Sequence, residues 1–143
     1  MSNYTTQMDA ARKGIITKEM EIAAKKENMD VKELMEYMAK GQVIIPCNKL
    51  HTSIEPNAIG SMLKTKINVN LGISRDWKDM DMEIEKVNNA VKMGAESIMD
   101  LSSYGDTRTF RKRLTKECPA MIGTVPTVSY THLRAHETRS NLV

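Results

Sequence analysis

The stretch Ile67-Asn-Val-Asn-Leu-Gly72 decides the fold class of this chain, because apolar and amide side chains alternate along it as they do along a β-strand. A second short apolar run covers residues 98–101, and a third covers residues 120–125. A helix-patterned segment separates each run from the next. Strands that alternate with helices in this way predict right-handed crossovers, a parallel sheet and therefore an α/β fold.

The two segments between these strands carry helix start signals. Asp79 or Asp81 can cap the first helix, and Gly94 would end it. Asp106 can cap the second helix, which would run through Phe110 and Leu114. Residues 61–126 are therefore predicted to form consecutive strand–helix units.

The first 60 residues are predicted to form a helical region. Helix-compatible patterns cover residues 5–13, 17–26 and 31–40. The last of these is the clearest, because Asp30 and Glu33 form a capping-box-like start. A short extended run at residues 42–46 and a loop at residues 47–57 follow it.

The charge and hydropathy of the chain exclude some classes of partner. The 21 basic and 18 acidic residues are spread along the chain, so no basic stripe that could follow a nucleic acid backbone is present. No apolar run approaches the roughly 18 residues that a membrane-spanning helix needs, and the first residues lack the apolar segment of a signal peptide. We therefore expect a cytoplasmic protein with no nucleic acid and no membrane partner.

The chain has two cysteines, Cys47 and Cys118, which lie far apart in the sequence. This spacing provides neither a disulfide framework nor a Cys-x-x-Cys metal site. We therefore interpret both as structural cysteines in a reducing compartment.

Polar side chains occur in or just after all three predicted strands. They are Asn68, Asn70, Asp100, Ser102, Ser103 and Thr124. In a parallel α/β barrel, the carboxyl ends of the strands line the active site. We therefore expect this group as a whole to mark a functional site, although edge or turn polarity would explain any one member equally well.

Three motifs resemble those of one enzyme family. They are Lys66-Ile-Asn-Val-Asn-Leu-Gly-Ile-Ser74, Ile98-Met-Asp-Leu-Ser-Ser-Tyr-Gly105 and Pro119-Ala-Met-Ile-Gly-Thr-Val-Pro126. The segments Thr5-Thr-Gln-Met-Asp-Ala-Ala11 and Ile45-Pro-Cys-Asn48, together with His51, are similar to the same family. The family is that of the phosphomethylpyrimidine synthases of thiamine biosynthesis, and the resemblance covers residues 1–126.

The resemblance implies a helical N-terminal region followed by the first three strands of a truncated (β/α)8 barrel. The family's reaction is a radical S-adenosylmethionine rearrangement of 5-aminoimidazole ribotide to 4-amino-5-hydroxymethyl-2-methylpyrimidine phosphate. The implied cofactors of a full-length member are S-adenosylmethionine, a [4Fe-4S] cluster on a C-terminal cysteine triad, and zinc. Cys47 and Cys118 do not match that triad, so none of these groups is expected to be ligated by this chain. A homodimer is expected for the full-length enzyme.

The resemblance also implies two substrate-binding residues. The family's substrate-binding asparagine falls on Asn70, and its substrate-binding methionine falls on Met99. An amide can both donate and accept hydrogen bonds, and a thioether packs softly against a ring. The family's next substrate residue is a tyrosine, but this chain has Val128 at that position.

The last segment, residues 127–143, resembles no protein family and reads as the translation of a transposase-type sequencing adapter. We therefore interpret it as an artefactual tail and exclude it from the fold. His132 and His136 within it have the spacing of helical metal ligands, but no third ligand is identifiable.

The chain is consequently predicted to be an inactive, poorly folded N-terminal fragment of the synthase. Two alternatives remain open from the sequence. One is a small α/β binding module in which the tail is native, and the other is a metal-binding protein that uses His132 and His136.

Overall fold

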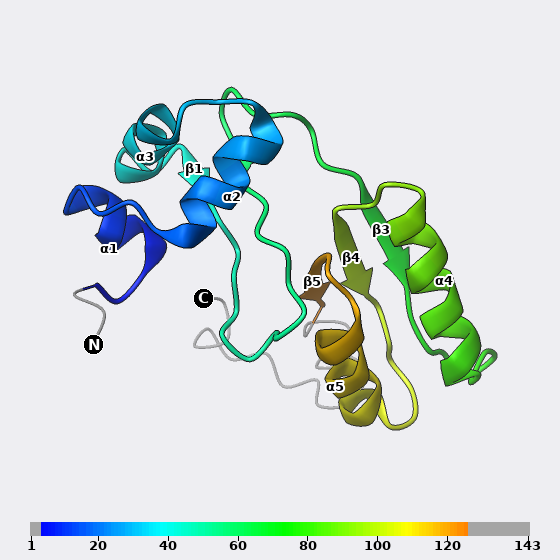
Figure 1. Cartoon of the computed structure of the whole chain (residues 1–143). Helices are drawn as coiled ribbons and strands as arrows, with labels where there is room; N and C mark the ends of the chain where they lie inside the picture. The colour runs from blue at the N-terminus through cyan, green and yellow to red at the C-terminus, as the bar shows by residue number, and fades with distance from the viewer. Residues whose placement is uncertain (1–3, 126–143) are drawn as a thin grey trace, which may run out of the picture. The chain divides into compact units, whose positions relative to one another are not determined.

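The computed structural model describes residues 4–125, which form parts of two compact units (Figure 1). The first unit ends at Ile67 and the second begins at Asn68. The predicted tail at residues 127–143, with Val128, His132 and His136, lies outside the described residues.

The first unit begins with three helices, which are followed by a pair of short antiparallel strands. Its elements are α1 (Gln7–Arg12), α2 (Lys18–Glu27), α3 (Val31–Ala39), β1 (Val43–Ile44) and β2 (Ile59–Gly60). Each helix starts where a side-chain oxygen can accept a hydrogen bond from a backbone N–H of the first turn, and the capping residues are Thr6, Thr17 and Asp30. The predicted helices are therefore confirmed, with bounds that differ by at most two residues.

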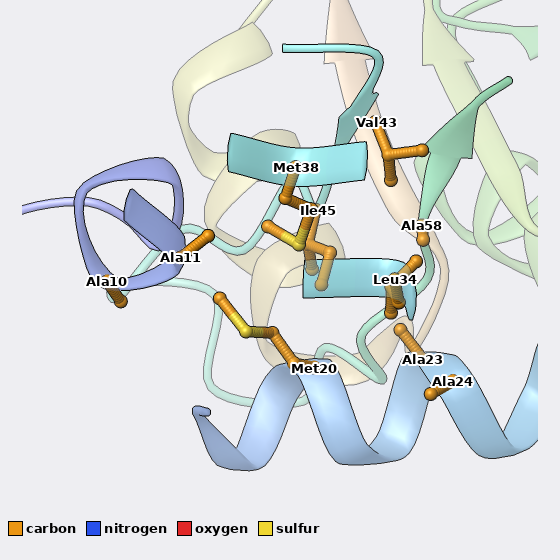
Figure 2. Packing of buried hydrophobic residues seen from close by; sticks show 10 residues of the cluster. All are labelled: Ala10, Ala11, Met20, Ala23, Ala24, Leu34, Met38, Val43, Ile45 and Ala58. Atoms are coloured by element: carbon orange, nitrogen blue, oxygen red, sulfur yellow. The ribbon is translucent and has the colours of Figure 1, made fainter. Parts of the chain in front are cut away.

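Small alanines and long methionines build the core of this unit. The buried cluster consists of Ala10, Ala11, Met20, Ala23, Ala24, Leu34, Met38, Val43, Ile45 and Ala58. In Figure 2, the side chain of Met20 extends from α2 toward the members of the cluster on α1 and α3. Alanine lets the helix backbones approach closely, and the unbranched methionine side chains fill the irregular spaces between them.

The antiparallel pair β1–β2 was only half predicted. The extended run at 42–46 contains β1, but nothing in the sequence pattern indicated its partner, β2, in which Ile59 pairs with Ile44 and Gly60 with Val43. Gly60 has a φ of 149°, and a Cβ there would overlap the backbone of Gln42. A side chain is therefore excluded at this position by the close approach of the opposite strand.

The second unit is a three-stranded parallel sheet with two crossover helices. Its elements are β3 (Asn68–Leu71), α4 (Met80–Lys92), β4 (Ser97–Asp100), α5 (Thr107–Glu117) and β5 (Met121–Thr124), and the strand order is β3-β4-β5. The predicted α/β class and the parallel sheet are thereby confirmed. Asp79 caps α4 and Asp106 caps α5. The structure thus selects Asp79 over Asp81, the other cap that the sequence allowed for α4.

Both helices pack on the same face of this sheet. One hydrophobic cluster joins Ile98 of β4 to Ile84 and Val87 of α4 and to Phe110 and Leu114 of α5. Because side chains alternate between the two faces of a strand, the residues next to Ile98 point to the other face. That open face of the sheet carries the side chains of Asn68, Asn70 and Met99.

Candidate functional site

Asn70 and Met99, the two residues singled out from the sequence, lie side by side. In the parallel register Asn70 is the partner of Met99, and Met99 is the partner of Gly123 on the next strand. Residues paired in register project from the same face of a sheet. The three positions therefore form one row across β3, β4 and β5 on the open face, with Asn70 exposed and Met99 and Gly123 half-buried.

A neighbouring amide orients Asn70. The Nδ2 atom of Asn68 donates a hydrogen bond to Oδ1 of Asn70 over 3.1 Å. The two residues are two positions apart on β3, so they share a face of the strand. This hydrogen bond directs the amide oxygen of Asn70 toward Asn68 along the strand.

The thioether of Met99 extends over β5. A Cβ built on Gly123 would lie 3.0 Å from Cε and 3.1 Å from Sδ of Met99, which is closer than van der Waals contact. The end of the Met99 side chain therefore occupies the space that a side chain at Gly123 would take. It points toward β5 and away from Asn70, which is on β3.

The loops that follow β3 and β4 are held together by backbone hydrogen bonds. The N–H of Leu101 donates to the carbonyl oxygen of Leu71 over 2.7 Å, and the N–H of Ser103 donates to that of Ile73 over 3.0 Å. Gly72, which lies between Leu71 and Ile73, has a φ of 150°, and a Cβ there would lie 2.5 Å from the backbone nitrogen of Ser102. Only glycine allows the two loops to approach so closely.

Asp100 and Ser102 are buried, and they stabilise these loops by hydrogen bonds. They do not line the open face, so the expectation that all six polar residues of the strand ends mark a functional site is wrong for these two. Asp100 is fully buried, and its Oδ1 accepts a hydrogen bond from the Ser102 N–H over 2.8 Å. Its Oδ2 lies 2.6 Å from Nε of Arg111 on α5. The hydroxyl of Ser102 accepts a hydrogen bond from the N–H of Ile73. A period of two places Asp100 on the helix-covered face together with Ile98.

Glu83 is a buried polar residue that the sequence reading missed. Its side chain on α4 is 1% exposed, and its Oε2 accepts a hydrogen bond from the backbone N–H of Gly72 over 3.0 Å. Its Oε1 lies 2.5 Å from Nζ of Lys86. Its spacing relative to Ile84 and Val87 puts it on the apolar face of α4. This position was the one feature of the sequence that could have indicated that Glu83 is buried.

The cysteines in the described residues do not fit a metal cluster. Cys118 is buried in the apolar cluster beneath the sheet, and burial raises the pKa of its thiol. Cys47 packs against the core of the first unit, where burial and the charge of Glu19 raise its pKa. Iron–sulfur clusters need several thiolates together, and residues 4–125 contain no group of three or more potential metal ligands. The interpretation of both cysteines as structural agrees with this environment.

The row of Asn70, Met99 and Gly123 lies within a segment that matches a known family. A family model described as the Radical SAM ThiC family matches residues 6–142. The chain belongs to this family. The match confirms the resemblance stated from the strand motifs.

Two curated relatives of this Radical SAM ThiC family member are both phosphomethylpyrimidine synthases. The chain is 67% identical over 124 residues to a phosphomethylpyrimidine synthase of Clostridium botulinum, and 68% identical over 123 residues to one of Alkaliphilus oremlandii. These alignments cover 87% and 86% of the chain, but only 28% of each relative. The chain thus spans little more than a quarter of the length of these synthases.

Within the part of the chain that the structure describes, no helix is long and apolar enough to cross a bilayer.

The family match extends into residues 127–143, which the sequence led us to interpret as an artefactual tail, whereas the two relatives align over shorter stretches. The interpretation of residues 127–143 stays a prediction.

Proposed function

We propose that this chain supplies part of the substrate site of a phosphomethylpyrimidine synthase. The whole enzyme would convert 5-aminoimidazole ribotide to 4-amino-5-hydroxymethyl-2-methylpyrimidine phosphate in thiamine biosynthesis, by radical S-adenosylmethionine chemistry. Family membership supports the enzyme class. The observation that carries the proposed site is the pairing of Asn70 with Met99 on one face of the parallel sheet.

The two side chains offer complementary contacts to a small heterocycle. The amide of Asn70 can hydrogen-bond to a polar ring edge, and its oxygen is already directed toward Asn68. The thioether of Met99 is polarizable and can pack against the flat face or edge of a ring. Since the paired Cα atoms of neighbouring strands are about 5 Å apart, one aminoimidazole ring is wide enough to touch both residues. Binding and orientation are therefore the roles of this chain in the proposed reaction.

The proposed architecture is the first part of a (β/α)8 barrel. Three parallel strands in sequential order, with both crossover helices on one face, support it, because a barrel uses this arrangement repeatedly. The open face would then become the interior of the barrel. A homodimer is proposed for the whole enzyme from the family alone.

The cofactors of the proposed reaction would be bound outside the described residues. The two cysteines are separate and structural, so we assign no step of the reaction to a cluster, to zinc or to S-adenosylmethionine at residues of this chain. The 143-residue chain by itself is accordingly expected to show no turnover.

A chimeric enzyme tests the proposed function. The segment of this chain that aligns with the Clostridium botulinum synthase would replace the matching segment of that enzyme. Consumption of 5-aminoimidazole ribotide would then be measured with the reconstituted cluster. The chimera should form the pyrimidine phosphate, and an Asn70→Ala chimera should have a KM about tenfold higher, the loss expected for one or two hydrogen bonds to substrate.

Asn88→Ala is the matched control, because Asn88 is an exposed amide on α4 outside the sheet. Its KM should equal that of the unsubstituted chimera. A chimera that folds and loads its cluster but leaves the ribotide unchanged would disprove the proposed function. Equal KM values for Asn70→Ala and Asn88→Ala would disprove the proposed site.

A further inference from the structure

We propose that Gly123 is a positioning residue for the substrate, because its missing side chain lets the Met99 thioether lie over β5 and keeps the space beside Asn70 open. This inference rests on the proposed function, since it assigns Gly123 a role in the site formed by Asn70 and Met99. It follows from the register of three strands and from the space around one glycine.

The backbone conformation of Gly123 does not require glycine. Six other glycines in the described residues have a positive φ, but Gly123 is not among them. It lies in the middle of β5, in register with Met99 of β4. Glycine in a strand interior weakens the strand because it adds conformational freedom to the unfolded chain and has no side chain to pack. A reason other than backbone geometry must therefore account for glycine at this position.

The space around Gly123 provides that reason. The nearest atoms to an added Cβ are Cε and Sδ of Met99, at 3.0 and 3.1 Å, and both belong to the end of a flexible side chain. No backbone atom is among these near neighbours. An alanine would consequently displace the Met99 thioether and leave the strands in place.

The direction of this displacement matters for the site. Met99 has Gly123 on one side and Asn70 on the other, because β4 is the middle strand of the three. A methyl group at Gly123 blocks the position over β5, so the thioether must turn toward β3 or rise from the sheet. Either movement intrudes on the space next to the Asn70 amide, where a bound ring would lie.

Gly123→Ala in the chimeric enzyme tests the inference kinetically. The KM for 5-aminoimidazole ribotide should rise about fivefold while kcat changes little, because ground-state binding is what a displaced Met99 disturbs. In a Met99→Ala background, the same substitution should have no further effect, because no thioether remains to be displaced. A purely structural role of Gly123 would instead lower activity by the same factor in both backgrounds, which would overturn the inference.

Methyl NMR of the chimeric enzyme provides a readout that does not depend on activity. With ¹³C-methyl methionine, the Met99 resonance is identified by its loss in Met99→Ala. In Gly123→Ala this resonance should shift more than that of any other methionine in the second unit. An unmoved Met99 resonance would overturn the inference even if the chimera is active. An inactive chimera with a shifted Met99 resonance would instead count against the proposed function and support the placement of Met99.

Discussion

At the scale of single residues, Asn68 is the neighbour that determines how Asn70 presents its amide. Its Nδ2 donates to Oδ1 of Asn70, and both side chains are exposed on the open face of the sheet. An amide can rotate to either of two orientations, and only its hydrogen-bond partners select one. The proposed substrate contact of Asn70 thus depends on a residue that need not touch the substrate.

Asn68→Ala in the chimera should therefore weaken substrate binding without removing Asn70. We expect the KM for 5-aminoimidazole ribotide to rise about fivefold, as the loss of a hydrogen bond worth about 1 kcal/mol would produce. Steady-state kinetics measures this, with Asn88→Ala as the control on the surface of α4. An unchanged KM in Asn68→Ala would show that Asn70 keeps its orientation without this partner.

At the scale of elements, the pair Asp100–Arg111 joins the end of β4 to α5. The carboxylate is fully buried and lies 2.6 Å from Nε of Arg111, whose Nη2 also donates to the carbonyl oxygen of Ser102. A buried carboxylate that loses its cation remains desolvated and unpaired, which is strongly destabilising. This pair therefore holds the loop after β4 on the helix that follows it.

Arg111→Met should consequently destabilise β4 and α5 by about 2 kcal/mol, less than the cost of breaking a fully buried ion pair, because the Arg111 side chain is 35% exposed. Hydrogen–deuterium exchange of the chimera, read on peptides from α5, measures this as faster exchange. Arg113→Met on the same helix is the control, because Arg113 pairs with Asp81 and Glu117 at the surface. Its effect on exchange should be much smaller, because ion pairs at the exposed surface contribute little to stability. Equal exchange in the two variants would contradict the role given to Arg111.

At the scale of the whole molecule, a buried ion pair connects α2 to the last residues of the first unit. Nζ of Lys66 lies 2.6 Å from Oε1 of Glu27, and the two side chains are 8% and 4% exposed. The backbone N–H of Lys64 donates to the other oxygen of Glu27. Burial by itself would raise the pKa of Glu27, but the hydrogen bonds from Lys66 and Lys64 outweigh it and lower the pKa from its ordinary value of 4.5.

This lowered pKa makes the first unit sensitive to acid. A depressed carboxyl pKa contributes stability above the unfolded value of 4.5, and the contribution is lost as the pH falls through the folded value. We expect the chimeric enzyme to lose its helical signal at a lower urea concentration at pH 3 than at pH 6. Glu27→Gln should lower the urea midpoint at pH 6 and reduce its change with pH.

Glu36→Gln provides the comparison for Glu27→Gln, because Glu36 pairs with Lys40 over 4.0 Å at the exposed surface. Its urea midpoints should match those of the unsubstituted chimera at both pH values. If Glu27→Gln retained the full pH dependence of the unsubstituted chimera, the acid sensitivity would have to come from other carboxylates, such as Glu19, whose pKa is also lowered.

The second unit leaves apolar surface and sheet edges uncovered among the described residues. The outer edges of β3 and β5 pair with no further strand among these residues, and Leu101 just after β4 is 40% exposed. Parallel sheets are normally covered on both faces. We therefore expect residues 1–126 alone to lack a cooperative thermal transition, as measured by calorimetry. A cooperative transition from a monomer, verified by sedimentation, would contradict this expectation.

The sequence by itself determined the local elements, their succession along the chain and the parallel character of the sheet. Caps such as Asp30 and Asp106, and the alternation along residues 67–72, act within a few residues, so they can be identified without tertiary contacts. The strand motifs also indicated the family to which the chain belongs. The partner strand β2 could not be predicted, because its pairing with β1 depends on a contact across a long loop.

Only the tertiary structure decided which polar residues face the site. Asn68, Asn70, Asp100 and Ser102 look equivalent in the sequence, since each is a small polar residue in or after a strand. Because α4 and α5 pack on one face of the sheet, Asp100 and Ser102 are buried and stabilise the loops, whereas the two asparagines lie on the open face. The physical reason is that burial and ion pairing with residues distant in sequence, such as Arg111, are set by how helices cover a sheet, which no local pattern encodes.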